Sequence, residues 1–366
     1  MPTPTIKKLP PLWVIRATGK VRNFLMSLGR GMFPPEYVMM ETASGFWVAK
    51  AIGVASDLGL ADILKDGPLT IDELASRTGT HPASLLRLMR VLTGNGIFKY
   101  KGNDVFINNK LSRALMEDSN SMKYFIRHHL GQNNWEFVGD LEQSVRTGEN
   151  AIKRITGMEP FEFLRDKPEK SLLFNRAMTD SNEMSLPLFL AAYPFGKYKK
   201  IIDVGGGQGY MISAIASKYK HIEGVVFDLP HVVPQAIENF NKFGVANRCS
   251  FVEGDFFEKV PQGGELYIVK NILHDWDDAT CIKILKNIHA AMPAGARLLI
   301  IDALIEDNNK NSFGKILDLQ MLIGTTGGRE RTRAEFSAVF TAAGFRLLRT
   351  IDTATPFSFI EGIMMG

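Results

Sequence analysis

The chain has 366 residues, of which 45% are hydrophobic and 22% charged, so it is long enough for two domains with sizeable cores. No apolar run is long enough to cross a bilayer, and a net charge of +4 gives little indication of nucleic-acid binding. Cys249 and Cys281 form neither a disulfide framework nor a zinc pattern, which predicts buried free thiols in a reducing cytoplasm. Metal-ligand clusters are absent from the sequence, so no metal is expected at the site.

Residues 1–35 form a basic arm with six cations and no acid. Three interpretations stay open: a flexible arm, an arm that packs on a partner subunit, and an amphipathic membrane-surface or transit segment. The lack of acids fits targeting, but serine is scarce. We favour an arm that lies on the protein, because Trp13, Phe24 and Phe33 would be costly to leave in water.

Residues 36–115 are predicted to form a mainly helical domain. From Tyr37 to Leu64, apolar residues recur at three- and four-residue steps among small residues. This face is too apolar for one monomer to cover, which predicts a homodimer through this domain. A further helix begins after Thr70, which acts as N-cap while Glu73 completes a capping box.

The same domain shows a winged-helix pattern. A helix over 82–93 is followed by a hairpin that pairs 97–100 with 105–107. Such modules often bind DNA, but this helix carries only Arg87 and Arg90 as cations. We therefore expect a scaffold or dimerisation role and no nucleic-acid partner.

Residues 116–366 are predicted to form an α/β domain that begins with a helical bridge over 116–196. Strands and helices then alternate, which indicates a parallel sheet covered on both faces. The expected strands are 199–204, 224–228, 249–252, 265–269, 297–302, 346–351 and 357–364. Only 352–356 separate the last two, too few for a crossover helix, so they should pair antiparallel. The expected fold is a Rossmann-like, mostly parallel, seven-stranded sheet with an antiparallel C-terminal hairpin.

A glycine-rich loop follows the first of these strands, with glycines at 205, 206, 207 and 209. Glycines let the backbone approach a ligand closely, and the first turn of the next helix offers unpaired N–H groups. The loop is not the dinucleotide fingerprint, because Tyr210 stands where that pattern needs a third glycine.

Acidic residues also follow the next two strands. Asp228 can accept hydrogen bonds from both ribose hydroxyls, and Asp255 can accept one from the adenine amino group while Phe256 stacks on the ring. Ligands of such sheets bind beyond the carboxyl ends of the strands. Together with the glycine loop, these residues indicate an adenosyl ligand that has no pyrophosphate.

Five segments carry a resemblance to a known family. They are DVGGG at 203–207, FDLP at 227–230, GDFF at 254–257, KNILHDW at 270–276 and GGRERT at 327–332. With them the chain resembles the caffeic-acid-type small-molecule O-methyltransferases of plants and bacteria, which use S-adenosylmethionine and have a winged-helix dimerisation domain. The resemblance runs from about residue 36 to the end.

The resemblance implies a set of cofactor contacts. It places Gly205 and Gly207 beside the methionine part, Asp228 with its neighbour Leu229 at the ribose, Asp255 and Phe256 at the adenine, Lys270 at the adenosyl region, and Met178 near the reacting sulfur.

Methyl transfer to a hydroxyl requires that the oxygen be aligned and its proton removed. His274 follows the fourth strand on the ligand side, and its counterpart in the family is the general base. An imidazole with the unperturbed pKa of about 6.5 is neutral at pH 7. The resemblance implies two acidic partners for it. Glu330 matches one directly, whereas Asp302 stands where many relatives have Glu, so its shorter side chain leaves the contact with His274 open.

The resemblance also implies acceptor contacts from Trp135, Asn271, Asp275, Met321 and Thr325. Apolar walls suggest a planar aromatic or polycyclic hydroxylated acceptor, of the kind found in secondary metabolism. Two other functions stay open. The fold and cofactor could serve hydroxylation or decarboxylation, against which the His274–Glu330 pair argues. The chain could also be a cofactor-sensing winged-helix regulator, which the poorly basic helix disfavours.

Overall fold

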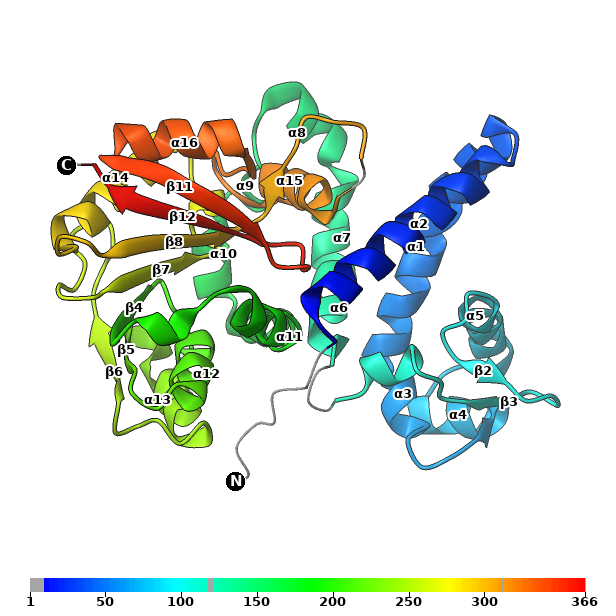
Figure 1. Ribbon diagram of the computed structural model, residues 1–366. Coiled ribbons are helices and arrows are strands. Elements are labelled where there is room, and N and C mark those ends of the chain that lie inside the picture. Colours follow the sequence, from blue (N-terminus) through cyan, green and yellow to red (C-terminus); the bar gives the residue numbers. More distant parts are fainter. Residues whose placement is uncertain (1–9, 118–120, 311, 366) are drawn as a thin grey trace. The chain divides into compact units, whose positions relative to one another are not determined.

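The computed structural model describes residues 10–117, 121–310 and 312–365. It divides into two compact units. Figure 1 shows the chain coloured from its N-terminus in blue to its C-terminus in red. The first comprises Ala17–Gly139 and Leu164–Met184. The second comprises Asp140–Phe163 and Ser185–Gly366 with the chain's first residues through Arg16. No helix among the described residues is both long and apolar enough to cross a membrane.

The first unit contains the predicted winged-helix module. Its helices are α2 (Pro35–Asp57), α3 (Leu60–Ile63), α4 (Ile71–Thr78) and α5 (Pro82–Gly94). Its strands β1 (Leu69–Thr70), β2 (Lys99–Tyr100) and β3 (Val105–Ile107) form an antiparallel sheet in the order β1-β3-β2. The predicted capping box is confirmed, because the Thr70 side chain accepts from Glu73 N and the Glu73 carboxylate accepts from Thr70 N. Leu60, Leu74 and Phe106 are completely buried in the core of this module.

The helices between the winged-helix module and the large sheet are mostly short, and α11 is the longest of them. They are the 3-10 turn η1 (Ser112–Leu115), α6 (Lys123–Leu130), α7 (Gln132–Gly139), α8 (Leu141–Thr147), α9 (Ala151–Thr156), α10 (Pro160–Asp166) and α11 (Pro168–Ala192). These helices confirm the predicted helical bridge.

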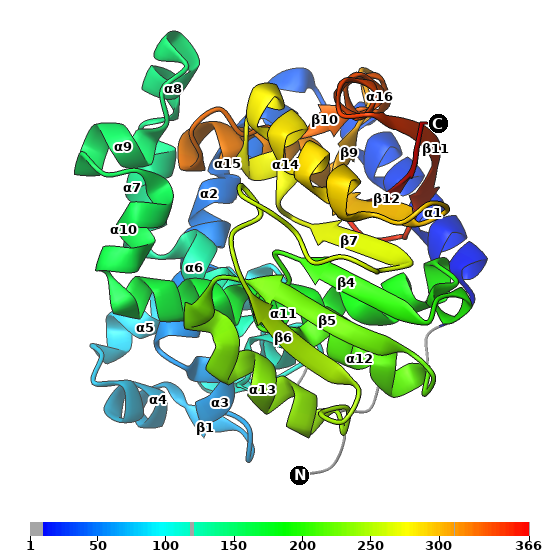
Figure 2. The same cartoon turned by 90° about the vertical axis from the view of Figure 1, so that its left-hand side faces the viewer.

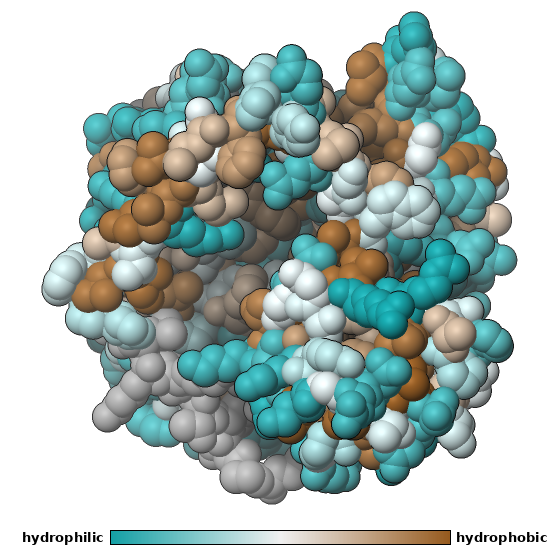
Figure 3. All heavy atoms as spheres, turned by 90° about the vertical axis from the view of Figure 1, so that its right-hand side faces the viewer, coloured by the Kyte–Doolittle hydropathy of each residue, from teal (hydrophilic) through white to brown (hydrophobic). Residues whose placement is uncertain are grey.

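The described part of the N-terminal arm is a helix, α1 (Leu12–Gly31). The arm was expected to lie on the protein so that its aromatic side chains would be covered. This expectation is wrong for the single chain, because Trp13, Phe24 and Phe33 are 71%, 66% and 66% exposed. Apolar side chains of α2, such as Trp47, are exposed as well. In the space-filling view, hydrophobic side chains remain uncovered among hydrophilic ones (Figure 3).

The second unit is built on the predicted seven-stranded sheet, in the order β11-β12-β8-β7-β4-β5-β6. The strands are β4 (Lys200–Val204), β5 (Glu223–Asp228), β6 (Cys249–Glu253), β7 (Leu266–Lys270), β8 (Arg297–Asp302), β11 (Phe345–Asp352) and β12 (Ser358–Met364). Strands β4, β5, β6, β7 and β8 pair with one another in parallel, while β12 pairs antiparallel with both β8 and β11. The predicted fold class is therefore confirmed.

Helices cover both faces of this sheet. Successive side chains of each strand point to opposite faces, so both faces carry apolar side chains that a helix layer buries. Ile201 and Ile268 pack with α12 (Tyr210–Lys218), α13 (Val233–Lys242) and the end of α11. Ile202 and Val269 pack with α14 (Asp278–Ala291) and α16 (Arg333–Ala342) on the opposite face. Figure 2 shows these two helical layers on either side of the strands.

Two short strands and one helix complete the edge of the sheet where the parallel strands end. Strand β9 (Leu304–Ile305) pairs in parallel with β10 (Arg331–Thr332), and α15 (Phe313–Gly324) lies between them in sequence. This pairing brings the GGRERT segment back to the region that follows β8. The carboxyl ends of the parallel strands, where ligands of such folds bind, thus receive residues from a distant part of the sequence.

Candidate active site

The loop after β4 has a backbone that favours glycine. Gly205, Gly207 and Gly209 have φ of +68°, +54° and +64°, values that other residues rarely adopt. A Cβ on Gly205 would lie 2.6 Å from Ile272 Cδ1, whereas a Cβ on Gly207 would meet no atom within 4 Å. The loop is therefore packed from behind at Gly205 and borders open space at Gly207, which leaves room for a ligand against the backbone.

Asp228, the last residue of β5, contacts this loop directly. Its Oδ2 accepts a hydrogen bond from Gly207 N at 2.7 Å, and its Oδ1 accepts one from Leu229 N at 2.7 Å. A carboxylate can accept several hydrogen bonds at once, so the chemistry of this side chain suits ligand hydroxyls. The structure thus joins the β4 loop and the end of β5, as the sequence predicted for a ribose-binding acid.

The ends of β6 and β7 supply the other predicted cofactor residues. After β6, Asp255 Oδ1 accepts from Phe257 N at 2.8 Å, and the ring of Phe256 is half-buried against the sheet's core. At the end of β7, Lys270 is partly buried, and its Nζ lies 5.9 Å from the ring centre of Phe357. The chemistry of these residues fits an adenosyl ligand, with carboxylates for its hydroxyl and amino groups and an aromatic face for its base.

A buried acid and a lysine lie beneath the loop. Burial raises the pKa of Asp203 to about 7, although the charge of Lys270 acts in the opposite direction. Burial likewise lowers the pKa of Lys270 to about 8, while Asp203 and Asp302 oppose that change. Each group thus stabilises the charged form of the other in a region that disfavours isolated charges.

His274 lies in a 3-10 turn, η4 (Leu273–Asp275), directly after β7 and is only 7% exposed. Its Nδ1 is 2.8 Å from Glu330 Oε1, and its Nε2 is 3.7 Å from Asp275 Oδ1. Glu330 is itself fixed, because its backbone N–H donates to Asp318 Oδ1 at 2.8 Å. The structure therefore brings together the predicted base and the predicted acid that orients it, although 56 positions separate them in sequence.

The surrounding acids change the charge of His274. Burial alone would lower its pKa, but the charges of Asp275, Glu330 and Asp302 and the hydrogen bond to Glu330 raise the pKa to about 10. The expectation that this imidazole is neutral at pH 7 is therefore wrong for the chain without ligands. Carboxylate oxygens of Glu330 and Asp275 lie 2.8 Å and 3.7 Å from nitrogens of the ring, Asp302 adds its charge, and an imidazolium is the form that these acids stabilise.

Asp302, the last residue of β8, does not hydrogen-bond to His274. The side chain is fully buried, and neither carboxylate oxygen has a hydrogen-bond partner among the described residues. Burial raises its pKa to about 7, and the positive charges of His274 and Arg331 act against this increase. The contact left open by its short side chain is thus not seen in the described structure, while the charge of Asp302 favours a raised pKa of His274.

Comparisons with known proteins agree with this geometry. Residues 138–346 match the model of an O-methyltransferase domain, and residues 40–118 match an O-methyltransferase dimerisation domain. The chain belongs to this O-methyltransferase family. As a member it is an S-adenosylmethionine-dependent enzyme, and the resemblance seen in its sequence is confirmed.

Several relatives of this O-methyltransferase cover nearly the whole chain. A phenazine O-methyltransferase from Lysobacter antibioticus is 36% identical over 90% of this chain and 97% of its own length. A mitomycin biosynthesis 6-O-methyltransferase from Streptomyces lavendulae is 35% identical over 89% and 94%. Among solved structures, LaPhzM has a TM-score of 0.86 at 35% identity and covers 91% of this chain and 100% of its own.

Two residues of the candidate site could not be predicted from the sequence. Arg331, the neighbour of Glu330, is 1% exposed and bonds to the backbone around His274, and Asp318 holds the backbone of Glu330. The only sequence signal for Arg331 is its place in the GGRERT segment, where an arginine next to the predicted catalytic acid reads as a surface charge. The burial of the Arg331 guanidinium follows from the pairing of β10 with β9, which the sequence alone does not indicate.

The predicted acceptor contacts fall into two groups. Asn271, Asp275, Met321 and Thr325 belong to the unit that carries His274, and the buried Oδ1 of Asn271 has no partner among the described residues. Trp135 on α7 belongs to the other compact unit, as does Met178 on α11, which was predicted as a cofactor contact near the reacting sulfur. Their approach to the site therefore stays a prediction.

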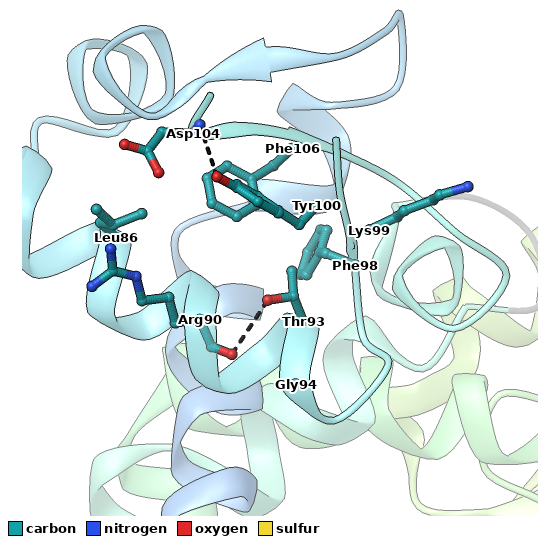
Figure 4. Close-up of a pocket in the computed structure, with 9 residues that line it drawn as sticks. All are labelled: Leu86, Arg90, Thr93, Gly94, Phe98, Lys99, Tyr100, Asp104 and Phe106. Atoms are coloured by element: carbon teal, nitrogen blue, oxygen red, sulfur yellow. Dashed lines mark hydrogen bonds between the residues drawn. The ribbon is translucent and has the colours of Figure 1, made fainter. Parts of the chain in front are cut away.

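A cavity of about 490 Å³ lies in the winged-helix module, apart from any predicted site residue (Figure 4). It opens between α5 and the β2–β3 hairpin, and is lined by Leu86, Arg90, Thr93, Gly94, Phe98, Lys99, Tyr100, Asp104 and Phe106. Tyr100 closes one side, where its hydroxyl accepts from Asp104 N at 3.3 Å. None of the acid, histidine and glycine residues of the methyltransferase site contributes to it.

Proposed function

We propose that the chain transfers the methyl group of S-adenosylmethionine to a hydroxyl of a small aromatic or polycyclic acceptor, with His274 as the general base. One observation carries this proposal. Glu330 holds Nδ1 of His274 at 2.8 Å, which fixes the ring and leaves Nε2 as the atom that meets the acceptor. A base oriented by a buried carboxylate is the arrangement that proton removal from a hydroxyl requires.

The cofactor site is formed by the loop after β4 and the ends of the following strands. Gly205 and Gly207 would lie along the methionine part, Asp228 would accept from the ribose, and Asp255 with Phe256 would contact the adenine. Bound S-adenosylmethionine supplies a methyl group that its positive sulfur has already activated. The chain's residues therefore have two tasks, which are to orient the acceptor oxygen and to take its proton.

The raised pKa of His274 suits a phenolic acceptor. A phenol has a pKa of about 10, close to that of this imidazolium, so the proton can pass between the two with little cost. Because His274 is already protonated in the ligand-free chain, one proton leaves to solvent when a phenol binds, and the one proton that remains is shared between Nε2 and the acceptor oxygen. The acceptor can therefore bind as an ion pair, in which Glu330 balances the charge of His274 while the oxygen is methylated.

The acceptor class is supported by the relatives and by the aromatic residues beside the His274 turn. The relatives are named for phenazine, mitomycin and naphthoate acceptors, and a related enzyme is solved with 1,4-dihydroxy-2-naphthoic acid. In this chain, Trp276 follows the turn and lies between two rings, with centroids 5.8 Å from Phe161 and 4.9 Å from Phe257. Flat aromatic surfaces of this kind favour planar acceptors.

We also propose that the chain forms a homodimer through its N-terminal domain. The match of residues 40–118 to a dimerisation domain supports this, as do the exposed side chains of Tyr37, Phe46 and Trp47 on α2. The two free, buried thiols support the reducing, cytoplasmic location expected from the sequence. Analytical ultracentrifugation of the full chain would test the dimer, and a monomer at micromolar concentration would contradict it.

The experiment that tests the function follows a labelled methyl group. The full-length protein is incubated with S-adenosylmethionine labelled in its methyl group and 1,4-dihydroxy-2-naphthoic acid or a hydroxyphenazine. Product NMR should locate the label on an oxygen. One relative at 31% identity is an N,N-dimethyltransferase, so the matching amino compounds form the control arm and should react more slowly. Oxidised or decarboxylated products in place of methylated ones would overturn the proposal.

A further inference from the structure

Arg331 is almost fully buried, yet no role in the reaction is suggested by its position in the sequence. Its side chain is 1% exposed, and all three nitrogens of the guanidinium donate hydrogen bonds. Nη1 donates to Leu273 O at 2.8 Å, Nη2 donates to Trp276 O at 2.7 Å, and Nε donates to Asp278 Oδ1 at 2.9 Å. The guanidinium thus contacts both sides of the turn that carries His274.

The two carbonyl groups belong to the residues that flank His274 and Asp275. Leu273 precedes the pair and Trp276 follows it, so one rigid guanidinium holds both ends of the turn at a fixed separation. Its five N–H donors lie in one plane, a geometry that lysine cannot reproduce. Asp278, the first residue of α14, anchors the guanidinium. The clamp, by which we mean the Arg331 guanidinium and its bonds to the carbonyls of Leu273 and Trp276, is thereby joined to this helix.

The segment that bears Arg331 also contacts the turn through its backbone. A Cβ on Gly328 would lie 2.4 Å from His274 O and 2.7 Å from the carbonyl carbon of Asp275, so only glycine fits there without movement. Glu330, the adjacent residue, reaches the ring of His274 from the same segment. One short piece of chain therefore holds the backbone and orients the side chain of the same histidine.

We propose that Arg331 is a positioning residue, which fixes the turn around His274 so that the imidazole meets Glu330 through Nδ1 and presents Nε2 to the acceptor. The inference rests on the proposed role of His274 as base. It adds a claim about geometry that can be tested without any acceptor, because the hydrogen bond between His274 and Glu330 has its own spectroscopic signature.

Arg329 provides a matched control for Arg331. It lies two positions away, pairs with the same carboxylate at 2.8 Å, and pairs with Glu335 as well. Its side chain is 41% exposed, and in the described part of the chain its guanidinium donates to Asp278 and Glu335 rather than to the carbonyls of the His274 turn. Both variants keep the positive charge, so a comparison of Arg331→Lys with Arg329→Lys separates the loss of the contacts to the His274 turn from the loss of a guanidinium beside Asp278.

The test measures the titration of His274 by NMR in protein with labelled histidine, and binding of S-adenosylhomocysteine by calorimetry. In Arg331→Lys, the pKa of His274 should fall from its wild-type value by about one pH unit or more, because the turn no longer holds the ring against Glu330. The turnover number with a saturating acceptor should fall about 10- to 100-fold. Arg329→Lys should leave both unchanged, and cofactor affinity should persist in both variants.

A second variant keeps the proposal open to refutation if Arg331→Lys does not fold. Asp278→Asn retains the guanidinium but weakens its anchor, so the pKa of His274 should move in the same direction by a smaller amount. An unchanged titration of His274 in a folded Arg331→Lys or in Asp278→Asn would overturn the proposal. If Arg331 positions the turn but His274 is not the base, the titration of His274 changes in both variants while turnover does not. Failure of the proposed function can therefore be told apart from failure of the positioning role.

Discussion

The contact between His274 and Glu330 predicts a measurable change when the carboxylate becomes an amide. The two atoms are 2.8 Å apart, and both side chains are buried, with 7% and 2% of their surfaces exposed. Glu330→Gln keeps the shape of the side chain and can still accept from Nδ1–H. It removes the negative charge that stabilises the imidazolium, so the pKa of His274 should fall.

The magnitude follows from the strength of the bond. A hydrogen bond to a charged partner contributes about 1.5–3 kcal/mol, which corresponds to a pKa change of about 1–2 units. His274 should therefore titrate well below its wild-type pKa of about 10 in Glu330→Gln. It should not return fully to an ordinary value, because Asp275 and Asp302 remain. A histidine NMR titration of the ligand-free protein, assigned with His274→Asn, gives the value directly.

The same change has a consequence for stability. A pKa that is higher in the folded than in the unfolded protein stabilises the fold fully below pH 6.5, and this contribution is lost as the pH rises towards 10. Chemical unfolding should show a difference of about 1.5–3 kcal/mol between wild type and Glu330→Gln at pH 6, with a smaller difference at pH 9.5. A His274 titration that is identical in both proteins would refute the reasoning.

Three further substitutions test the glycine loop, the ribose acid and the winged-helix module. Asp228→Ala should weaken binding of S-adenosylhomocysteine at least about tenfold by calorimetry, because Gly207 N also loses its partner; unchanged affinity would remove Asp228 from the site. Gly205→Ala should lower stability by about 1–3 kcal/mol, since its φ is +68° and Ile272 lies 2.6 Å from the new Cβ; a wild-type melting curve would contradict the loop geometry. Thr70→Ala should cost about 1 kcal/mol of unfolding free energy through the lost capping box, and Thr70→Ser should restore it.

Much of the fold could be predicted because its signals are local. Apolar runs of strand length that end in an acid, and a glycine cluster before a helical pattern, depend on neighbouring residues alone. The strand ends at Asp228 and Asp302 were placed at the observed positions. The helix α1 was not predicted, because its apolar side chains suggested an arm that lies on the protein rather than an exposed helix.

The charge of the site could not be predicted in the same way. His274 receives its raised pKa from acids at positions 275, 302 and 330, which only the pairing of β9 with β10 and the neighbouring strands bring together. The burial of Arg331 is likewise a consequence of contacts with Leu273 and Trp276, more than fifty positions away. Sequence patterns indicate which residues can do chemistry, whereas long-range packing decides their protonation and their partners.

The central claim is that His274 takes the proton of the acceptor hydroxyl, and His274→Asn tests it most directly. The measurement is the rate of labelled methyl transfer to 1,4-dihydroxy-2-naphthoic acid or the best acceptor found, at saturating S-adenosylmethionine, alongside calorimetry with S-adenosylhomocysteine. We predict that turnover falls by about 10²- to 10⁴-fold while the affinity for S-adenosylhomocysteine is unchanged. Turnover within a few-fold of wild type in this variant would contradict the claim.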